Sequence, residues 1–215
     1  MANLKKHLLI FLIIIGLDTT SVNAQLSDSP LQKNFFVLNS SLFVNEASLN
    51  SEKSQLIGSG HSFAIDYRRL IMNNERGSIY ALIGIGDFRM GYSGWIDNSG
   101  VSENFSATER YTVLSGGFVG SLKSRQNPLD FLDLEVTFAY WRLNNQSYFV
   151  NGTSIFPKAE SRLSIMFYPH YSKVFDNVKF SIGPFANIDL AEFNETGKPF
   201  DLALFGLRLD LGIGF

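Results

Sequence analysis

The sequence predicts an all-β protein, an eight-stranded antiparallel up-and-down transmembrane β-barrel. Three observations support this prediction. Eight segments alternate apolar and polar side chains with the period of two that a strand imposes. The connections between these segments alternate between short turns and longer polar stretches, as in membrane barrels. The closing segment, ALFGLRLDLGIGF, keeps one face wholly apolar and places Gly, Arg and Asp on the other.

Three segments open the predicted barrel, and each has an apolar face. In the second, Phe63 and Ile65 alternate with Asp66 and Arg68, so apolar and charged side chains point to opposite faces. In the first and third, the apolar positions of one parity are Phe36, Leu38, Leu42, Val44, Ile79, Ala81, Ile83 and Ile85. The three strands are predicted over residues 34–44, 55–70 and 78–92.

Five further segments complete the ring. The fourth is interrupted by glycine, and neither it nor the third shows which parity faces inward. In the fifth, Leu134 and Val136 alternate with Asp133 and Glu135. In the sixth and seventh, the apolar positions of one parity are Leu163, Ile165, Phe167, Val178, Phe180, Ile182, Ala186, Ile188 and Leu190. These strands are predicted over residues 110–122, 129–142, 159–173, 178–190 and 203–215. Every one can cross a bilayer as a tilted strand, which takes about 9 to 11 residues.

The connections differ in length on the two sides of the predicted barrel. Three are short turns rich in Asn, Gly, Pro and Asp, namely NNERG, KSRQNP and FDN. The others are longer polar loops, predicted over residues 45–54, 93–108, 143–158 and 191–200. An even strand count leaves both chain ends on the short-turn side, which is the periplasmic side of an outer-membrane barrel.

The first residues have the pattern of a secretory signal peptide. Two lysines precede an apolar run from Leu8 to Gly16, and the small residues Val22 and Ala24 precede a cleavage position before Gln25. The run is too short for a membrane anchor, which needs about 20 apolar residues. The predicted division is a signal peptide over 1–24, an N-terminal periplasmic lead over 25–33 and the barrel domain over 34–215.

Composition excludes several classes of protein. The 215-residue chain has 20 Phe, 8 Tyr and 18 Gly but no Cys, which rules out a disulfide scaffold and a thiolate metal site. Its formal net charge of −2 makes a nucleic-acid partner unexpected. No His, Asp or Glu cluster has metal-ligand spacing, so neither a metal nor a cofactor is expected.

The inward parity carries charges that nearly balance. Eight strands leave an interior that side chains can fill, so an open pore is not expected, and buried charges persist only in pairs. The predicted pairs are Lys179 with Asp210 and Asp189 with Arg208, while Glu135 or Asp133 is an alternative partner for Arg208. The predicted charge network of the lumen is Asp66, Arg68, Asp133, Glu135, Glu160, Arg162, Lys179, Asp189, Arg208 and Asp210.

The closing strand resembles the C-terminal signature of bacterial outer-membrane β-barrels. Its outward positions are Phe205, Leu207, Leu209, Leu211, Ile213 and the terminal Phe215. The resemblance implies an outer-membrane location, contact with membrane lipids and recognition by the barrel-assembly machinery. The size and layout resemble the small eight-stranded barrels of the outer-membrane protein A and X type. The NAQ cleavage context is similar to exported proteins of Bacteroidetes.

One short motif raises the alternative of an enzyme. In YPHYSKVFDN, His170 and Ser172 share a parity, as a base and a nucleophile on one strand must. The motif resembles the His-x-Ser-Asn element of outer-membrane lipid A deacylases, but Lys173 stands where that family has Asn. The topology also places His170 inside the lumen near a periplasmic turn, far from the outer leaflet. A non-enzyme is therefore expected, with a lipid hydrolase as the alternative.

The expected function is a structural or surface-interaction role. A rigid scaffold commonly carries its binding residues on loops, and the predicted loops 93–108 and 143–158 mix aromatic residues with Asn, Ser and Gly. These loops are the predicted contact sites for an extracellular ligand or protein. The remaining alternative is a soluble lipocalin-like barrel, in which the apolar parity would line a ligand cavity and the charged parity would face water.

Overall fold

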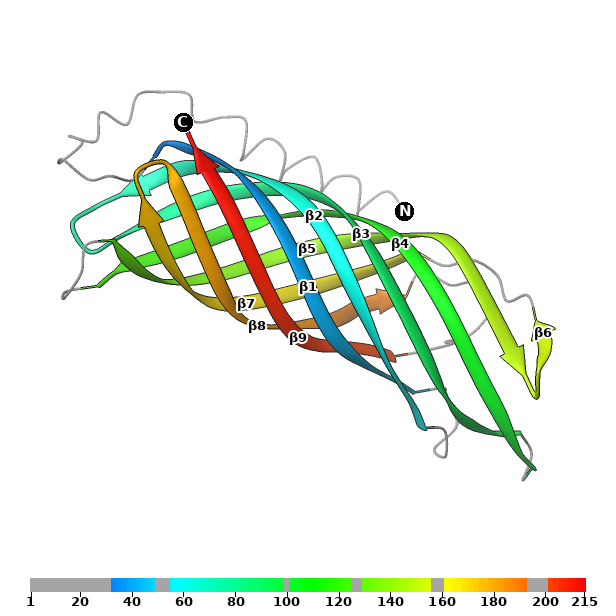
Figure 1. Ribbon diagram of the computed structural model, residues 1–215. Coiled ribbons are helices and arrows are strands. Elements are labelled where there is room, and N and C mark those ends of the chain that lie inside the picture. Colours follow the sequence, from blue (N-terminus) through cyan, green and yellow to red (C-terminus); the bar gives the residue numbers. More distant parts are fainter. Residues whose placement is uncertain (1–31, 49–54, 99–100, 125–128, 156–160, 193–200) are drawn as a thin grey trace.

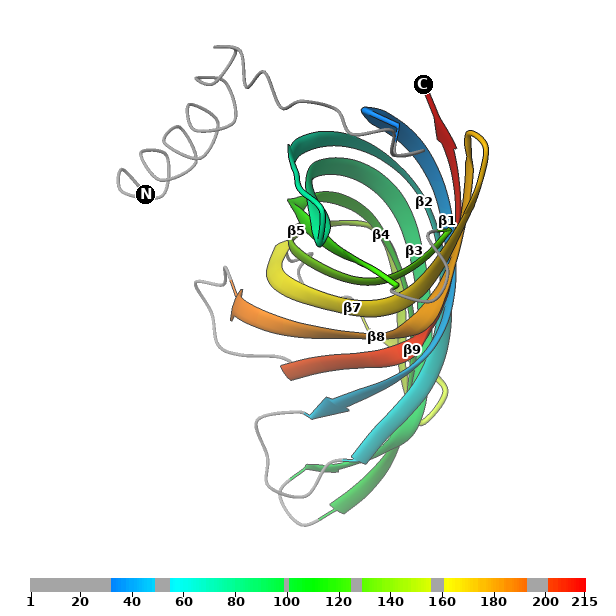
Figure 2. The ribbon, with the colours of Figure 1, turned by 90° about the vertical axis from the view of Figure 1, so that its left-hand side faces the viewer.

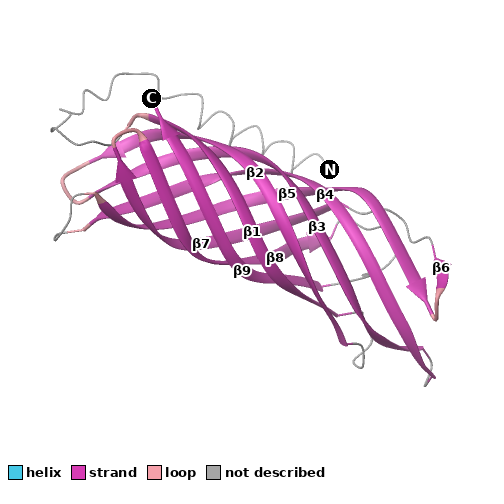
Figure 3. Cartoon of the chain, viewed as in Figure 1, coloured by secondary structure: helices cyan, strands magenta, loops and turns pink. Residues whose placement is uncertain are grey.

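The computed structural model shows a closed ring of long antiparallel strands (Figure 1). It describes residues 32–48, 55–98, 101–124, 129–155, 161–192 and 201–215. The predicted signal peptide and most of the predicted periplasmic lead lie outside the described residues. Strands account for nearly all of the described chain (Figure 3). No helix in the described part is both long enough and apolar enough to cross a membrane.

Eight of the nine strands in the described residues form the ring. Each strand pairs antiparallel with its neighbours, β4 pairs with β5, and β1 pairs with both β2 and β9, which closes the barrel (Figure 2). The predicted all-β, eight-stranded antiparallel fold is thereby confirmed. The strands are β1 Asn34–Ser48, β2 Gln55–Asn73, β3 Gly77–Asn98, β4 Val101–Lys123, β5 Asp130–Val150, β6 Thr153–Ile155, β7 Ser161–Phe175, β8 Val178–Glu192 and β9 Asp201–Gly214.

The two faces of the ring differ as the alternation predicts. In β9, Leu209 is 53% exposed on the outer face, whereas its neighbours Arg208 and Asp210 are each 4% exposed inside. The structure also shows which parity of the two glycine-rich strands faces inward, because Tyr80 of β3 and Tyr111 of β4 are buried inside the ring. The outer wall is therefore apolar and the lumen holds the charges, which is opposite to the arrangement of a soluble lipocalin-like barrel.

The prediction of two long loops is wrong, because most of these residues belong to β-strands. β3 runs to Asn98 and β4 begins at Val101, so the predicted loop 93–108 is almost entirely a β-hairpin. β5 runs to Val150 and turns through Asn151 and Gly152 into β6. Both turn residues have positive φ, 50° and 78°, which is the type I′ geometry that Asn-Gly adopts in two-residue hairpins.

The strands consequently differ in length on the two sides of the barrel. β3 and β4 contain 22 and 23 residues, whereas β7 and β8 contain 15 each and β9 contains 14. At about 3.4 Å per residue, the longer strands extend roughly 25 Å further. Figure 1 shows β3, β4 and β5 continuing past β7, β8 and β9 at the end away from the C-terminus. We call residues 91–98, 101–108, 146–150 and 153–155 the projecting sheet.

The barrel closes where the ends of the ring strands meet. The backbone N–H of Phe215 donates to the carbonyl of Asn34 over 3.0 Å, and the rings of Phe215 and Phe36 stack with centroids 5.4 Å apart. The β1–β9 ladder runs from Phe35 opposite Gly214 to Ser48 opposite Asp201 without a register shift. Aromatic rings on the outer face therefore reinforce the closing seam.

The β7–β8 seam is interrupted in the middle of the wall. Ladder pairs join Phe167 to Ala186 and Tyr171 to Ile182, but none joins 168–170 to 183–185. That register places Pro169 opposite Pro184, and proline has no backbone N–H to donate to a ladder. The ladders on either side, β5–β7 and β8–β9, are continuous here, because Pro169 pairs with Leu134 and Pro184 pairs with Leu207.

Candidate functional site

The middle of the lumen contains a cluster in which two arginines share three carboxylates. Arg208 on β9 places its Nε 2.7 Å from Asp210, its Nη1 2.8 Å from Glu135 and its Nη2 3.0 Å from Asp66. Arg68 on β2 contacts Glu135 at 2.9 Å and Asp210 at 2.8 Å. Every charge therefore has at least one opposite charge within hydrogen-bonding distance, which offsets the desolvation that burial imposes. We call these five residues the charge cluster.

Neighbouring side chains hold the charge cluster in place. Asn39 on β1 donates its Nδ2 hydrogen to Asp66 over 2.8 Å, and the guanidinium of Arg208 lies over the ring of Tyr168 at 4.5 Å. Gly84 lies opposite Asp66 in the β2–β3 ladder, and a Cβ there would lie 2.0 Å from the Asp66 carboxylate. The glycines that hid the parity of β3 in the sequence therefore include one that makes room for this cluster.

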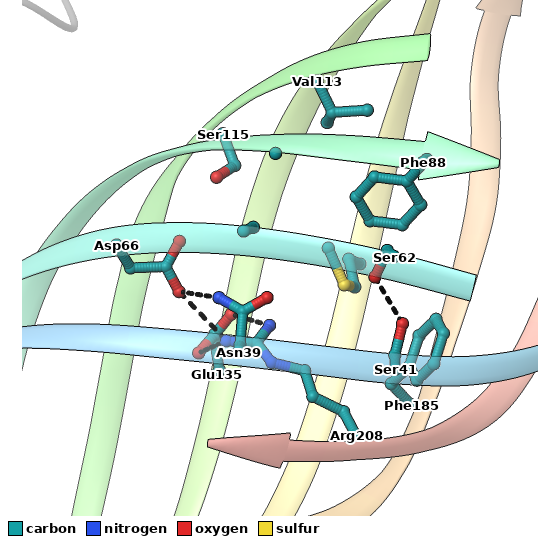
Figure 4. A pocket seen from close by; sticks show the side chains of 13 residues that line it. Asn39, Ser41, Ser62, Asp66, Phe88, Val113, Ser115, Glu135, Phe185 and Arg208 are labelled. Carbon is teal, nitrogen blue, oxygen red and sulfur yellow. Dashed lines mark hydrogen bonds and ion pairs between the residues drawn. The ribbon is translucent and has the colours of Figure 1, made fainter. Parts of the chain in front are cut away.

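Side chains almost completely fill the lumen around the cluster. A cavity of about 20 Å³ is lined by residues that include Asp66, Glu135 and Arg208 (Figure 4). That volume is close to the minimum for a single water molecule, about 10 to 15 Å³. At this level the barrel is a packed body rather than a channel.

A second ionic group lies nearer the short turns and is centred on Asp133. Its carboxylate oxygen Oδ2 accepts hydrogen bonds from Lys179 over 2.5 Å and from Ser172 over 2.6 Å. The Nε2 atom of His170 lies 3.2 Å from the same oxygen. Ser172 also hydrogen bonds to Ser181 over 2.9 Å. Three strands, β5, β7 and β8, thus meet at one carboxylate.

This arrangement differs from a nucleophile and its base. His170 and Ser172 are 2% and 0% exposed, and both contact Asp133 rather than each other. His170 stacks on Tyr168 with ring centroids 4.0 Å apart, and its Nδ1 lies 2.9 Å from the Tyr168 carbonyl. All of the contacts of these two side chains serve the packed interior.

The remaining members of the predicted network are placed as follows. Lys179 contacts Asp133, so its predicted pairing with Asp210 is wrong. Asp189 lies 3.4 Å from Arg162 and not against Arg208, whose carboxylate neighbours include the alternative partner Glu135. Glu160 lies outside the described residues. The six outward positions of the predicted assembly signal all lie on the outer face, and their exposure runs from 37% at Leu211 to 57% at Phe215.

Sequence reasoning missed a buried carboxylate toward the projecting sheet. Glu109 on β4 is 3% exposed and accepts hydrogen bonds from the hydroxyls of Tyr111 and Tyr148. Arg162 lies over the ring of Tyr111 at 5.7 Å. One pattern in the sequence could have revealed that Glu109 faces inward, but the glycines later in the same segment obscured it. Polar residues alternate there with Phe105, Ala107, Glu109, Tyr111 and Val113.

Aromatic rings fill the lumen between Glu109 and the charge cluster. Phe88 and Trp141 meet edge to face with centroids 4.6 Å apart, and Trp141 donates its Nε1 hydrogen to Ser164 over 2.7 Å. Phe43 contacts Phe88 and Phe185 at about the same level. We call Phe43, Phe88, Trp141 and Phe185 the aromatic layer.

The outer face of the projecting sheet has a different character from the wall below it. Small hydroxyl and amide side chains dominate, and two large rings interrupt them, with Trp95 43% and Phe149 40% exposed. The exposed polar positions of this face include Ser93, Asn104, Ser106, Thr108 and Ser147. On the inner face, by contrast, Tyr92, Phe105 and Tyr148 are buried.

Among the described residues, no group of three or more His, Asp or Glu side chains is arranged to hold a metal ion. No protein-family model matches the chain. No curated protein matches the sequence either.

Solved structures do share the fold. Neisserial surface protein A, NspA, superposes with a TM-score of 0.50 at 13% identity, covering 84% of this chain and 97% of that one. Ail, the attachment invasion locus protein of Yersinia pestis, gives 0.41 at 12% identity over 84% and 98%. The outer membrane protease OmpT from Escherichia coli gives 0.44 at 12% identity over 88% and 99%. At 13% identity, the likeness to Neisserial surface protein A shows the barrel fold and assigns no role to any residue.

Proposed function

We propose that this chain is an outer-membrane barrel whose packed lumen makes it an anchor and whose projecting sheet is an interaction surface. The observation that carries the proposal is the combination of a sealed interior with strands of 22 and 23 residues. A tilted strand needs about 9 to 11 residues to cross a bilayer, so half of each long strand is available outside it. The finer expectations of a cleaved signal peptide and recognition by the assembly machinery belong to the same proposal.

The outer wall supports the membrane location. Large apolar side chains are exposed around the ring, including Leu38 of β1, Ile83 of β3, Leu134 of β5 and Ile182 of β8. In water, a contiguous apolar surface of this extent would promote aggregation. In a bilayer it faces hydrocarbon, and the closed ring leaves no sheet edge in the membrane.

The projecting sheet supports the interaction role. Its described outer-face side chains are accessible and combine Trp95 and Phe149 with Ser, Thr and Asn. Rigid aromatic rings beside small hydrogen-bonding groups are typical of binding surfaces. Because β-sheet pairing rather than a loop holds these groups, a partner would meet a preformed surface and less ordering would oppose binding.

The interior supports a non-catalytic role. A nucleophile must reach its substrate and hydrogen bond to its base, whereas Ser172 is 0% exposed, donates its hydroxyl hydrogen to Asp133 and shares a second hydrogen bond with Ser181. A lipid hydrolase acting through His170 and Ser172 would require both side chains to leave the lumen.

Cysteine labelling tests the membrane location and orientation, because the chain has no native Cys. In intact cells, a membrane-impermeant maleimide should label Ser93→Cys on the projecting sheet. It should label Asp176→Cys, in the β7–β8 turn, only after the outer membrane is permeabilised. Leu209→Cys should resist the reagent in both conditions. Labelling of Asp176→Cys and protection of Ser93→Cys in intact cells would reverse the orientation, and labelling of all three would contradict membrane insertion.

Shortening the hairpin tests the interaction role. Replacing residues 93–106 by Asn-Gly keeps Tyr92 opposite Ala107 and should leave the barrel folded, since the register below is unchanged. The purified chain should bind members of a glycan and matrix-protein array, and the shortened chain should lose that binding. A control with Glu75→Ser and Arg76→Ser at the opposite end should bind like the parent. Equal binding by the parent and shortened chains would reject the projecting sheet as the contact surface.

A further inference from the structure

A row of basic side chains crosses the outer face just below the projecting sheet. The ladders place His61 of β2 opposite Arg89 of β3, and Arg89 opposite Arg110 of β4. All three side chains are exposed on the outer wall, with the two arginine side chains each 51% exposed. Arg142 of β5 is exposed on the same face.

One carboxylate orients the two central guanidiniums. Asp87 accepts the Nε hydrogen of Arg89 over 3.0 Å and that of Arg110 over 2.6 Å. Both bonds use Nε, so the Nη groups, which suit a phosphate best, are left to face a ligand. Three arginines against one aspartate leave this patch with an excess of positive charge.

The same row borders a groove and an apolar wall. A groove of about 540 Å³ on this side of the barrel is lined by His61, Arg89, Arg110 and neighbouring small residues such as Ser59 and Gly91. Toward the short turns the outer face becomes apolar, two positions from His61 on β2 and four positions from Arg89 on β3 and Arg110 on β4. The residues there are Phe63 at 53%, Ile85 at 53% and Leu114 at 51% exposed.

We propose that His61, Arg89 and Arg110 form a binding site for the phosphate group of an outer-leaflet lipid. The inference rests on the proposed membrane location. A lipid seated here would place its acyl chains against Ile85 and Leu114 and its phosphate in the groove between the guanidiniums. Charge, groove and apolar wall occur in the order that an amphiphilic anion requires.

Lipid binding by the full chain in detergent micelles tests the site, with phosphatidic acid, diacylglycerol and inorganic phosphate as probes. Native mass spectrometry should show phosphatidic acid retained on the parent chain and diacylglycerol lost. Arg89→Gln with Arg110→Gln should weaken phosphatidic acid binding at least tenfold. The control, Arg69→Gln with Lys173→Gln, removes two outward cations near the opposite rim and should change it less than twofold.

A third variant gives a change of opposite sign. Asp87→Asn removes the carboxylate that bonds to both arginines and should tighten phosphatidic acid binding, an effect that loss of folding cannot produce. Equal affinity in the parent and the double arginine variant would overturn the site. Competition by millimolar inorganic phosphate as effective as that by the lipid would show a site for soluble anions instead. Vesicle flotation of the same samples separates the two proposals, because a chain that inserts without phosphate preference refutes only the lipid site.

Discussion

The charge cluster and the aromatic layer fill adjacent levels of one lumen by different means. In the charge cluster, contacts of 2.7–3.0 Å tie Arg208 to three carboxylates. In the aromatic layer, ring centroids are 4.6–6.1 Å apart and area rather than direction determines the stabilisation. This difference implies that the stability of the charge cluster depends on its complete set of partners. The aromatic layer should instead lose stability in proportion to the apolar area removed.

The largest effect is expected from breaking the charge cluster at Arg208. Arg208→Leu should lower the free energy of unfolding by about 3 to 5 kcal/mol, because it leaves buried carboxylates without their main counter-charge. Urea unfolding of the refolded barrel in lipid measures the change.

The same experiment has an internal control. Adding Glu135→Leu to Arg208→Leu should restore part of the loss, since one of the stranded carboxylates is removed with its partner. Arg69→Leu, on the outer face, should change stability by no more than about 0.5 kcal/mol. A double variant less stable than the single one would show that the charges are not mutually compensating.

The next prediction compares the cost of introducing an arginine at two places on the outer face. Leu209→Arg places an arginine one position from Arg208 but on the outer wall, where it should cost about 2 to 4 kcal/mol if it faces the bilayer midplane. Thr108→Arg, on the outer face of the projecting sheet, should be nearly neutral in the same lipid refolding assay. Equal tolerance at both positions would contradict the assignment of the lipid-facing wall.

A smaller effect is expected in the aromatic layer. Trp141→Phe keeps most of the ring area but removes the hydrogen bond to Ser164, for a loss of about 1 to 2 kcal/mol. Urea unfolding should show a smaller shift than for Arg208→Leu, and a larger shift would mean that the aromatic level is as dependent on single contacts as the charged one.

The smallest effect on stability should come from the closing seam, which touches neither level. Phe215→Ala removes the ring stacked on Phe36 and should cost about 1 kcal/mol in refolded protein. Assembly in cells should fall much more, which quantitative blotting of outer-membrane fractions would detect. Parallel losses in both assays would argue that Phe215 acts through stability alone.

Most of the fold could be predicted from the alternation of apolar and polar side chains in the sequence. A period of two is a local property, so residues such as Leu209 and Asp210 reveal their faces without any knowledge of register. Partners are not local, because they depend on the shear of the whole ring. The pairing of Lys179 with Asp133 rather than Asp210 therefore could not be obtained from alternation.

The projecting sheet was missed for a related reason. Ser, Asn and Gly dominate residues 93–108 and 143–158, and such residues are usually loop formers, yet sheet pairing overrides that preference. The Asn151-Gly152 pair was the local signal of a hairpin. His170 and Ser172 show that alternation identifies a face but not a partner. Their shared parity predicts that they lie on one face, whereas only the structure shows that both contact Asp133.

The facing prolines at Pro169 and Pro184 have a consequence for motion. Seven of the eight seams carry ladder pairs across the middle of the wall, whereas the β7–β8 seam has none between residues 168–170 and 183–185. Local opening has a low free energy where few hydrogen bonds must break. The barrel should therefore fluctuate most readily along this seam, and amides bordering the gap should exchange with deuterium faster than those of β3 and β4. A wall whose other seams are paired across the middle would then have one defined line along which it can part.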